Sequence, residues 1–215
     1  MSAAAKNQPA NQPLPAYYDD LSLSLIAARD LLTTGAANRR SGAHTAVVAN
    51  IGPDGAPNQR VMILRECNWQ GRRLRFHTDA RADKVAQIQD APRLSVLVYD
   101  DATKLQLRIT GTAHISAGDA ADAAWHESTP FARRCYMAEA APGSISEGPT
   151  SGLPDWIEGA QPTEEQLAPV QANFAVLHCQ FDRIEWLFLA NKGHRRAVFS
   201  WDDAAQDWAN NWLVP

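Results

Sequence analysis

Basic and polar side chains that could bind a phosphate group occur in two short segments of the first half of the chain. The segment Arg60–Arg65 places a cation at each end of an apolar run, and the segment His77–Lys84 joins an expected strand to an expected helix. Free backbone N–H groups at the helix start, the Thr78 hydroxyl and Lys84 together make a plausible phosphate cradle. The alternatives are basic strand ends that aid solubility and ordinary helix capping by Thr78 or Asp79.

The two arginines of the first segment are expected to serve different purposes. In an uninterrupted strand, residues five positions apart point to opposite faces and lie roughly 17 Å apart. Unless a bulge interrupts the strand, Arg60 and Arg65 therefore cannot hold one phosphate together. The spacing predicts two anionic partners or two separate roles.

Two further polar groups lie later in the chain. Gln106 falls on the polar face of an expected strand, where its amide could bind the hydrogen-bonding edge of a ring or simply face solvent. His194, Arg195 and Arg196 open another expected strand directly after a turn at 191–193. Such a cluster at a sheet rim is a candidate anion site, although basic clusters are also common where no ligand binds.

Several other kinds of chemistry have no signature in the sequence. The chain contains no GxSxG nucleophile elbow, no HExxH zinc motif, no GxGxxG dinucleotide fingerprint and no GxxxxGK[ST] phosphate loop. Its six histidines are too dispersed to form a helical metal pair. We therefore expect no metal site, and no side chain is assigned a catalytic role.

Composition excludes some partners and compartments. The 215 residues are 45% hydrophobic, enough for a sizeable core, and the net charge of −4 gives no overall attraction to nucleic acid or to an anionic membrane. The sequence has no apolar run long enough to cross a bilayer and no signal peptide. Three scattered cysteines fit neither a disulfide framework nor a CxxC zinc site, so a cytoplasmic protein is expected.

The periodicity of the apolar residues predicts more strands than helices. Residues 1–15 are polar and predict a disordered tail, and 138–163 are rich in Gly, Pro and Ser and predict a long loop. Helices are expected from Asp19 or Asp20 to Leu32 with Gly35 past the end, over 79–89 and 117–127, and from Thr163. Strands are expected over 44–51, 59–66, 73–78, 94–99, 105–115, 174–182, 184–190, 194–201 and 208–213.

Strands that follow one another through short turns favour antiparallel pairing over alternating βαβ units. Within the expected strand 105–115, Leu105, Leu107 and Ile109 face one way, while Gln106 and Arg108 face the other. The expected fold is a mostly β protein, a β-barrel with peripheral helices, forming one domain over 16–215.

Taken in order, the segments described above resemble a known family. The order and spacing of these segments are similar to those of the FMN-binding split barrel of the pyridoxamine 5'-phosphate oxidase superfamily. The matching segments are Arg60–Arg65, then Phe76-His77-Thr78 with Lys84, then 104–111, and finally His194–Arg196 with the closing 212–215. The resemblance runs from about His44 to Pro215 and is strongest over 58–115. It is greater to oxidase-related FMN-binding proteins than to the vitamin-forming enzyme.

The resemblance implies FMN as cofactor and a homodimer with the flavin at the interface. It places Arg60 and Lys84 on the FMN phosphate and Arg196 near the redox-active edge of the ring. Gln106 would contact the ring from the second subunit. The other residues to which the resemblance assigns FMN contacts are Val61, Met62, His77 and Thr78. Substrate contacts would come from Arg65, His194 and one of Arg133 or Arg134.

Some residues depart from the family's pattern. Asp83 replaces an arginine that helps to bind the FMN phosphate, and Leu187 stands where the oxidase has a tryptophan on the flavin, although a register shift could bring in Trp186. The Tyr…Arg…Ser substrate motif is not recognisable, although similar chemistry is supplied at a different spacing by Trp125, Ser128, Arg133, Arg134 and Tyr136. The sequence therefore predicts an FMN-binding oxidoreductase acting on a small molecule other than pyridoxamine 5'-phosphate. A non-catalytic flavin-binding or storage protein, and a barrel that has lost flavin for another ligand, are the alternatives.

Overall fold

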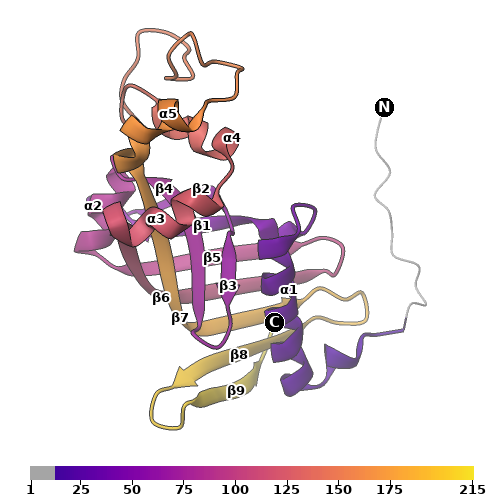
Figure 1. The fold of residues 1–215 in the computed structure, drawn as a ribbon. Helices are drawn as coiled ribbons and strands as arrows, with labels where there is room; N and C mark the ends of the chain where they lie inside the picture. Colours follow the sequence, from indigo (N-terminus) through magenta and orange to yellow (C-terminus); the bar gives the residue numbers. More distant parts are fainter. Residues whose placement is uncertain (1–12) are drawn as a thin grey trace.

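The protein is a curled antiparallel β-sheet with helices packed at its sides and one end (Figure 1). The computed structural model describes residues 13–215. Seven of its strands pair in the order β2-β1-β5-β6-β7-β4-β3, and β8 pairs with β7 and β9. The strands are β1 (Thr45–Ile51), β2 (Pro57–Ile63), β3 (Glu66–Asn68), β4 (Arg73–Asp79), β5 (Arg93–Asp100), β6 (Leu105–Ala117), β7 (Phe174–Phe188), β8 (Arg195–Asp202) and β9 (Asp207–Leu213). The expectation of a mostly β-barrel with peripheral helices is confirmed.

Strand β7 organises the sheet because it pairs with three other strands. Its first half pairs with β4, its second half with β8, and nearly its whole length with β6. The sequence predicts two strands here, but the structure has one continuous strand. The register of β6 against β7 shifts between Thr110 and Gly111, where a Cβ on Gly111 would lie 2.2 Å from the Gln180 carbonyl oxygen. Only glycine fits this bend.

The link between β2 and β4 closes the curl of the sheet. β2 ends at Ile63, and the next residues donate backbone hydrogen bonds across the gap, from Leu64 N–H to the His44 carbonyl and from Arg65 N–H to the Arg75 carbonyl. The expected uninterrupted strand over 59–66 is therefore wrong. Because the strand stops before Arg65, strand alternation does not force the side chains of Arg60 and Arg65 to opposite faces of the sheet.

The helices cover the open sides of the sheet. They are α1 (Leu21–Ala37), α2 (Asp83–Asp90), α3 (Asp122–Glu127), α4 (Pro130–Arg133) and α5 (Glu164–Leu167), with 3-10 turns at 16–18, 42–44, 118–121, 134–137 and 168–173. The Asp20 side chain caps α1 as predicted. The helix continues past Gly35, where a Cβ would lie 2.5 Å from the Cβ of Ala43. Helix α2 begins four residues later than expected, after Ala82, and neither Thr78 nor Asp79 caps it.

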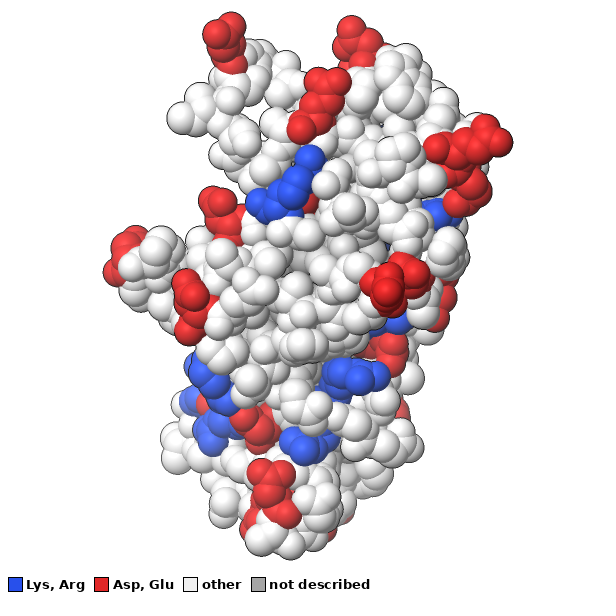
Figure 2. Space-filling model, turned by 60° about the vertical axis from the view of Figure 1, so that its left-hand side comes forward, with Lys and Arg blue, Asp and Glu red and all other residues white. Residues whose placement is uncertain are grey.

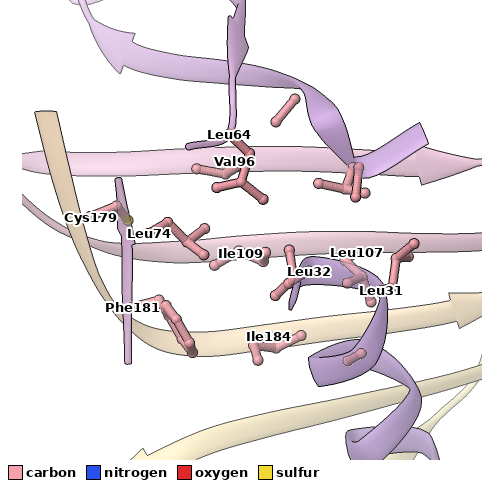
Figure 3. Packing of buried hydrophobic residues seen from close by; sticks show 14 of the residues in the cluster. Leu31, Leu32, Leu64, Leu74, Val96, Leu107, Ile109, Cys179, Phe181 and Ile184 are labelled. Carbon is pink, nitrogen blue, oxygen red and sulfur yellow. The ribbon is translucent and has the colours of Figure 1, made fainter. Parts of the chain in front are cut away.

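The main hydrophobic core lies inside the curl of the sheet (Figure 3). The predicted alternation along β6 is confirmed, since Leu105, Leu107 and Ile109 are buried while Arg108 is exposed. Leu14 and Tyr17 also pack on this core, so the folded part begins before residue 16. The rest of the expected tail, residues 1–12, lies outside the described residues.

A smaller cluster lies at the end of the molecule where α3, α4 and α5 gather (Figure 1). Trp125, Tyr136 and Phe174 form its centre. The loop 138–163 is irregular, as predicted, and Ile157 anchors its second half in this cluster. Figure 2 shows that acidic side chains dominate this end of the surface. No helix among the described residues has the length and apolar character needed to cross a membrane.

Candidate functional site

A cavity of about 350 Å³ opens where β2 meets β4 and α2, with the α4 segment on its far side. Its volume is within the usual range for small-molecule sites. Seven of the predicted site residues line it, and six further residues complete the wall. The predicted ones are Arg60, Val61, Met62, Arg65, His77, Thr78 and Lys84; the others are Ile63, Asp79, Ala132, Cys135, Tyr136 and Pro142.

Arg60 enters the cavity from the inner face of the sheet. It pairs directly with the buried Val48, so its side chain starts on the face that carries the core. Its guanidinium donates hydrogen bonds to the Asn50 side-chain oxygen and, at 3.4 Å, to the Val48 carbonyl. Burial lowers the pKa of Arg60, yet the group remains a cation because an arginine pKa starts so high.

Lys84 places a second cation beside Arg60. It lies in the first turn of α2, and burial, followed by the nearby Arg60 charge, lowers the pKa of its ammonium group. The Asp79 carboxylate in the same wall is engaged by Arg81, at 2.7 and 3.0 Å between its oxygens and the guanidinium nitrogens. The charges of Asp79 and Asp83 oppose the lowering of the Lys84 pKa, but their effects are smaller than those of burial and of Arg60. The Thr78 hydroxyl is buried next to these groups.

Arg65 and His77 leave polar atoms without partners at the cavity. In the described part of the chain, Arg65 makes no ion pair, and the buried Arg65 Nε and His77 Nε2 have no hydrogen-bond partner. Burial, then the charges of Arg65 and Arg75, lowers the pKa of His77 to about 3, so its ring is neutral at physiological pH. Buried polar atoms of this kind normally have partners. The orphaned atoms indicate that the cavity is built to receive a polar ligand.

This donor set suits an anionic ligand. Arg60, Lys84 and Arg65 make no ion pair with any carboxylate of the described chain. Like charges brought together without a counter-ion destabilise one another, and a phosphate would relieve this repulsion through charge-assisted hydrogen bonds. The cavity can therefore bind an anion between Arg60 and Lys84 and a second polar group near Arg65.

Apart from Tyr136, sequence reasoning missed the far wall of the cavity. Ala132 and Cys135 come from the α4 segment, and Pro142 from the long loop. Nothing in their types or spacing marks them, because the fold of a loop over the sheet decides their positions. Tyr136, the fourth member, is almost fully buried, and burial raises the pKa of its hydroxyl well above the usual range.

Gln106 and Arg196 lie on the opposite face of the sheet from Arg60. Cross-strand pairing places Tyr99, Gln106, Leu187 and Arg196 side by side on four neighbouring strands, β5 to β8. This row is on the outer face, and Gln106 lines a hollow there that is separate from the cavity. Within one chain, the structure therefore does not bring Gln106 or Arg196 to the ligand site of Arg60.

The outer row also holds Arg196 in an ion pair. Its guanidinium donates to the Glu185 carboxylate at 2.6 Å, and Arg108 and Arg183 contact the same carboxylate. Together these arginines, Arg196 first, hold the pKa of Glu185 below its usual range against the opposing effect of burial.

Three other residues considered from the sequence lie elsewhere. His194 lines a hollow with Trp212 and the C-terminal residues, away from the cavity. Arg133 is 3% exposed, with its guanidinium bound to Glu164 and stacked over Trp125, so its role here is to tie α4 to α5. Assigning a substrate contact to Arg133 is therefore not supported by its position. Trp186 is fully buried in the core, and no register shift brings it to the outer face.

A larger groove of about 550 Å³ runs along α1 and does not share these features. Its wall is mainly apolar, with Leu23, Ile26 and Leu31. The one buried carboxylate at its edge, Asp100, already accepts hydrogen bonds from Gly42 N–H and from Thr103. Among the described residues, Arg40 is the one cation without an ion pair that lines this groove, whereas three such cations line the cavity at Arg60, which is therefore the better candidate site.

Comparison with known proteins identifies the family of this chain. Residues 33–184 match the sequence profile of the family described as pyridoxamine 5'-phosphate oxidase. The chain belongs to the pyridoxamine 5'-phosphate oxidase family. The matched region contains all seven predicted residues that line the cavity.

Individual members of the pyridoxamine 5'-phosphate oxidase family are distant from this chain. A pyridoxine/pyridoxamine 5'-phosphate oxidase of Erythrobacter litoralis (strain HTCC2594) is 25% identical over 178 residues, covering 78% of this chain and 79% of that enzyme. The corresponding enzyme of Edwardsiella ictaluri (strain 93-146) is 34% identical over 67 residues, which are 31% of this chain and only 30% of that enzyme.

A solved structure shows the same fold. It is that of a pyridoxamine 5'-phosphate oxidase-related, FMN-binding protein of Nostoc punctiforme PCC 73102, with a TM-score of 0.66 and 23% identity. The superposition covers 95% of this chain and 100% of that one. At this identity the likeness establishes the split-barrel fold and leaves the ligand to be argued from this chain's own residues.

Proposed function

We propose that this protein is an FMN-binding flavoprotein that acts as an oxidoreductase on a small anionic or polar substrate. The observation that carries the proposal is the set of three cations, Arg60, Lys84 and Arg65, that line one cavity without a carboxylate partner in the described chain. Family membership supports flavin as the ligand, and the absence of a dinucleotide fingerprint from the sequence favours one phosphate over a pyrophosphate.

The residues present fit FMN. Arg60 and Lys84 would donate to the phosphate, with Thr78 beside them, and the β2 segment Val61–Met62 would lie along the rest of the cofactor with His77 opposite. Asp83, which replaces a family cation, is the first residue of α2, is exposed and does not line the cavity, so it adds no carboxylate to the wall. When bound, FMN supplies a ring that accepts a hydride from a substrate carbon. The chain's own contribution is binding, orientation and exclusion of water.

The proposal includes a homodimer, which would complete each site. Arg60 is on the inner face of the sheet, whereas Gln106 and Arg196 are on the outer face, so one chain cannot use all three on one ligand. The outer face also exposes Val61 (62%), Tyr99 (42%) and Leu97 (38%) beside Gln106. A second copy packed on this face by a two-fold axis would cover these apolar residues and bring its Gln106 towards the first copy's cavity.

The position of Arg65 favours a substrate other than pyridoxamine 5'-phosphate. Arg65 stands where the oxidase has a lysine, and its planar guanidinium favours a flat, bidentate anion such as a carboxylate. The structure leaves Arg133 engaged by Glu164, so it adds no charge for a second phosphate. A non-catalytic flavin-binding or storage protein is the second candidate, because the described cavity contains no obvious general base.

The absorption spectrum of the purified protein tests flavin binding first. Bands typical of oxidised flavin, with a cofactor mass equal to that of FMN, are expected. Anaerobic photoreduction followed by oxygen and candidate substrates then separates the oxidoreductase from the storage protein, because only the former is reduced by a substrate. Pyridoxamine 5'-phosphate under air should give little hydrogen peroxide, and turnover near the median enzyme rate of about 10 per second would contradict the proposed specificity.

A further inference from the structure

The environment of the Arg60 guanidinium contains a buried amide that no part of the proposed function uses. Asn50 is 2% exposed and lies on β1, the strand that pairs with β2. In the register of the two strands Arg60 faces Val48, which makes Asn50 its diagonal neighbour on the same inner face. Diagonal neighbours are about 7–8 Å apart at the backbone, within reach of a long side chain.

The hydrogen bonds of Asn50 determine which end of its amide faces Arg60. Its nitrogen donates to the Gln87 side-chain oxygen at 2.9 Å and to the Ile51 carbonyl at 3.0 Å. Both partners are acceptors, so both amide protons are used on that side. The oxygen must then point to the Arg60 guanidinium, from which it accepts a hydrogen bond.

Gln87 connects this arrangement to the second cation. It lies on α2 one turn after Lys84, and its oxygen also accepts from Asn58 on β2 at 3.2 Å. The two phosphate-binding candidates are thus linked through Asn50 and Gln87, one from the sheet and one from the helix. Because Arg60 and Lys84 repel each other, Arg60 needs a fixed acceptor to stay in the cavity.

A neutral acceptor has a specific advantage here. A carboxylate at this position would hold Arg60 but would also cancel its charge and repel an incoming dianion. An amide holds the guanidinium and leaves the whole positive charge available. We propose that Asn50 is a positioning residue that, through Arg60, gives the cavity its preference for a phosphorylated flavin over the same flavin without its phosphate.

This inference rests on the proposed function, and the test compares FMN with riboflavin. Riboflavin lacks only the phosphate, so the ratio of its dissociation constant to that of FMN isolates the contribution of Arg60 and its supports. Both constants are measured by quenching of flavin fluorescence with the full-length, flavin-free protein. In Asn50→Ala we expect FMN binding to weaken by roughly fivefold to twentyfold, with riboflavin within about twofold.

Two further variants sharpen the test. Asn50→Asp keeps the shape but adds a charge beside Arg60, so its FMN affinity should fall further than that of Asn50→Ala, again without a matching loss for riboflavin. In the double variant Asn50→Ala with Arg60→Ala, FMN should bind no more weakly than to Arg60→Ala alone, because Asn50 acts through Arg60.

Asn58→Ala is the matched control. Asn58 bonds the same Gln87 oxygen but is exposed and does not contact Arg60, so this variant should leave the ratio unchanged. If Asn50→Ala does not fold, Gln87→Ala at a half-exposed position removes the acceptor that orients the Asn50 amide. This variant should also lower the ratio of the riboflavin dissociation constant to the FMN dissociation constant.

The outcomes separate the two proposals. If Arg60→Ala weakens FMN binding while every Asn50 and Gln87 variant keeps the wild-type ratio, the inference about Asn50 is overturned and the proposed function stands. Equal losses for FMN and riboflavin in Asn50→Ala would also overturn it, because they indicate general damage. If the wild-type protein binds neither flavin, or Arg60→Ala binds FMN normally, the proposed binding site itself fails.

Discussion

The neutral, half-buried His77 makes the stability of the flavin-free protein depend on pH. Its pKa falls from an ordinary value of 6.5 to about 3, chiefly because of burial and then because of the charges of Arg65 and Arg75. Between these two pH values the unfolded chain takes up a proton at this ring and the folded chain does not. The unfolding free energy should therefore fall as the pH drops below 6.5, and continue to fall towards pH 3.

The size of this effect follows from the shift. Each pH unit below 6.5 costs up to about 1.4 kcal/mol, so lowering the pH from 7.5 to 5 should remove about 2 kcal/mol as an upper value. The replacement His77→Phe keeps an aromatic ring against Phe174, whose centroid is 5.0 Å from that of His77, but it cannot titrate. Between pH 7.5 and 5 the unfolding free energy of the variant should therefore fall by up to about 2 kcal/mol less than that of the wild type.

Urea unfolding followed by tryptophan fluorescence at pH 7.5, 6.5 and 5 measures the difference. His77→Phe also loses the 3.4 Å contact of His77 with the Ser128 hydroxyl, and it does so at every pH. The test therefore uses only how the difference in unfolding free energy between wild type and variant changes with pH. His126→Gln, at an exposed position on α3, is the control and should behave as wild type. Parallel pH curves for His77→Phe and wild type would refute the assignment of a neutral, half-buried His77.

Three other predictions concern the cofactor, the dimer and the barrel. Lys84→Gln should weaken FMN binding about tenfold while sparing riboflavin, measured by fluorescence titration. Leu97→Glu, which puts a charge on the apolar outer face, should convert a dimer to monomers in light scattering, and a wild-type monomer that binds FMN fully would contradict the dimer. Gly111→Ala should lower the unfolding free energy by roughly 2–4 kcal/mol, because its Cβ would collide with the Gln180 carbonyl, and an unchanged urea midpoint would contradict this account of the bend.

The strands of the barrel could be predicted because their signals are local. Alternation over 105–115 and the turns at Gly55 and Gly71 depend on residues that are neighbours in sequence. The end of β2 at Ile63 could not be predicted in this way. It depends on Arg65 pairing its backbone with Arg75, a contact that only the closed curl provides. This same contact is what brings Arg65 into the cavity with Arg60.

The residues of the site were predicted better than their relations to one another. Arg60, Thr78 and Lys84, which the resemblance brought together, line one cavity, although Arg60 lies in the middle of β2, Thr78 near the end of β4 and Lys84 in the first turn of α2. The type of Arg133 suggested an anion contact, whereas in the structure its partner is Glu164, which lies far along the chain, beyond the long loop. Ala132, Cys135, Pro142 and Asn50 gave no sequence signal, since their positions arise from packing between distant segments.

A titration of the full-length, flavin-free protein with FMN and with riboflavin tests the central claim most directly. We expect one FMN bound per chain, with an affinity for FMN that exceeds that for riboflavin by roughly tenfold to several hundredfold, and a large part of that difference lost in Arg60→Ala. Equal affinity for the two flavins, or no change in flavin fluorescence on addition of protein, would contradict it.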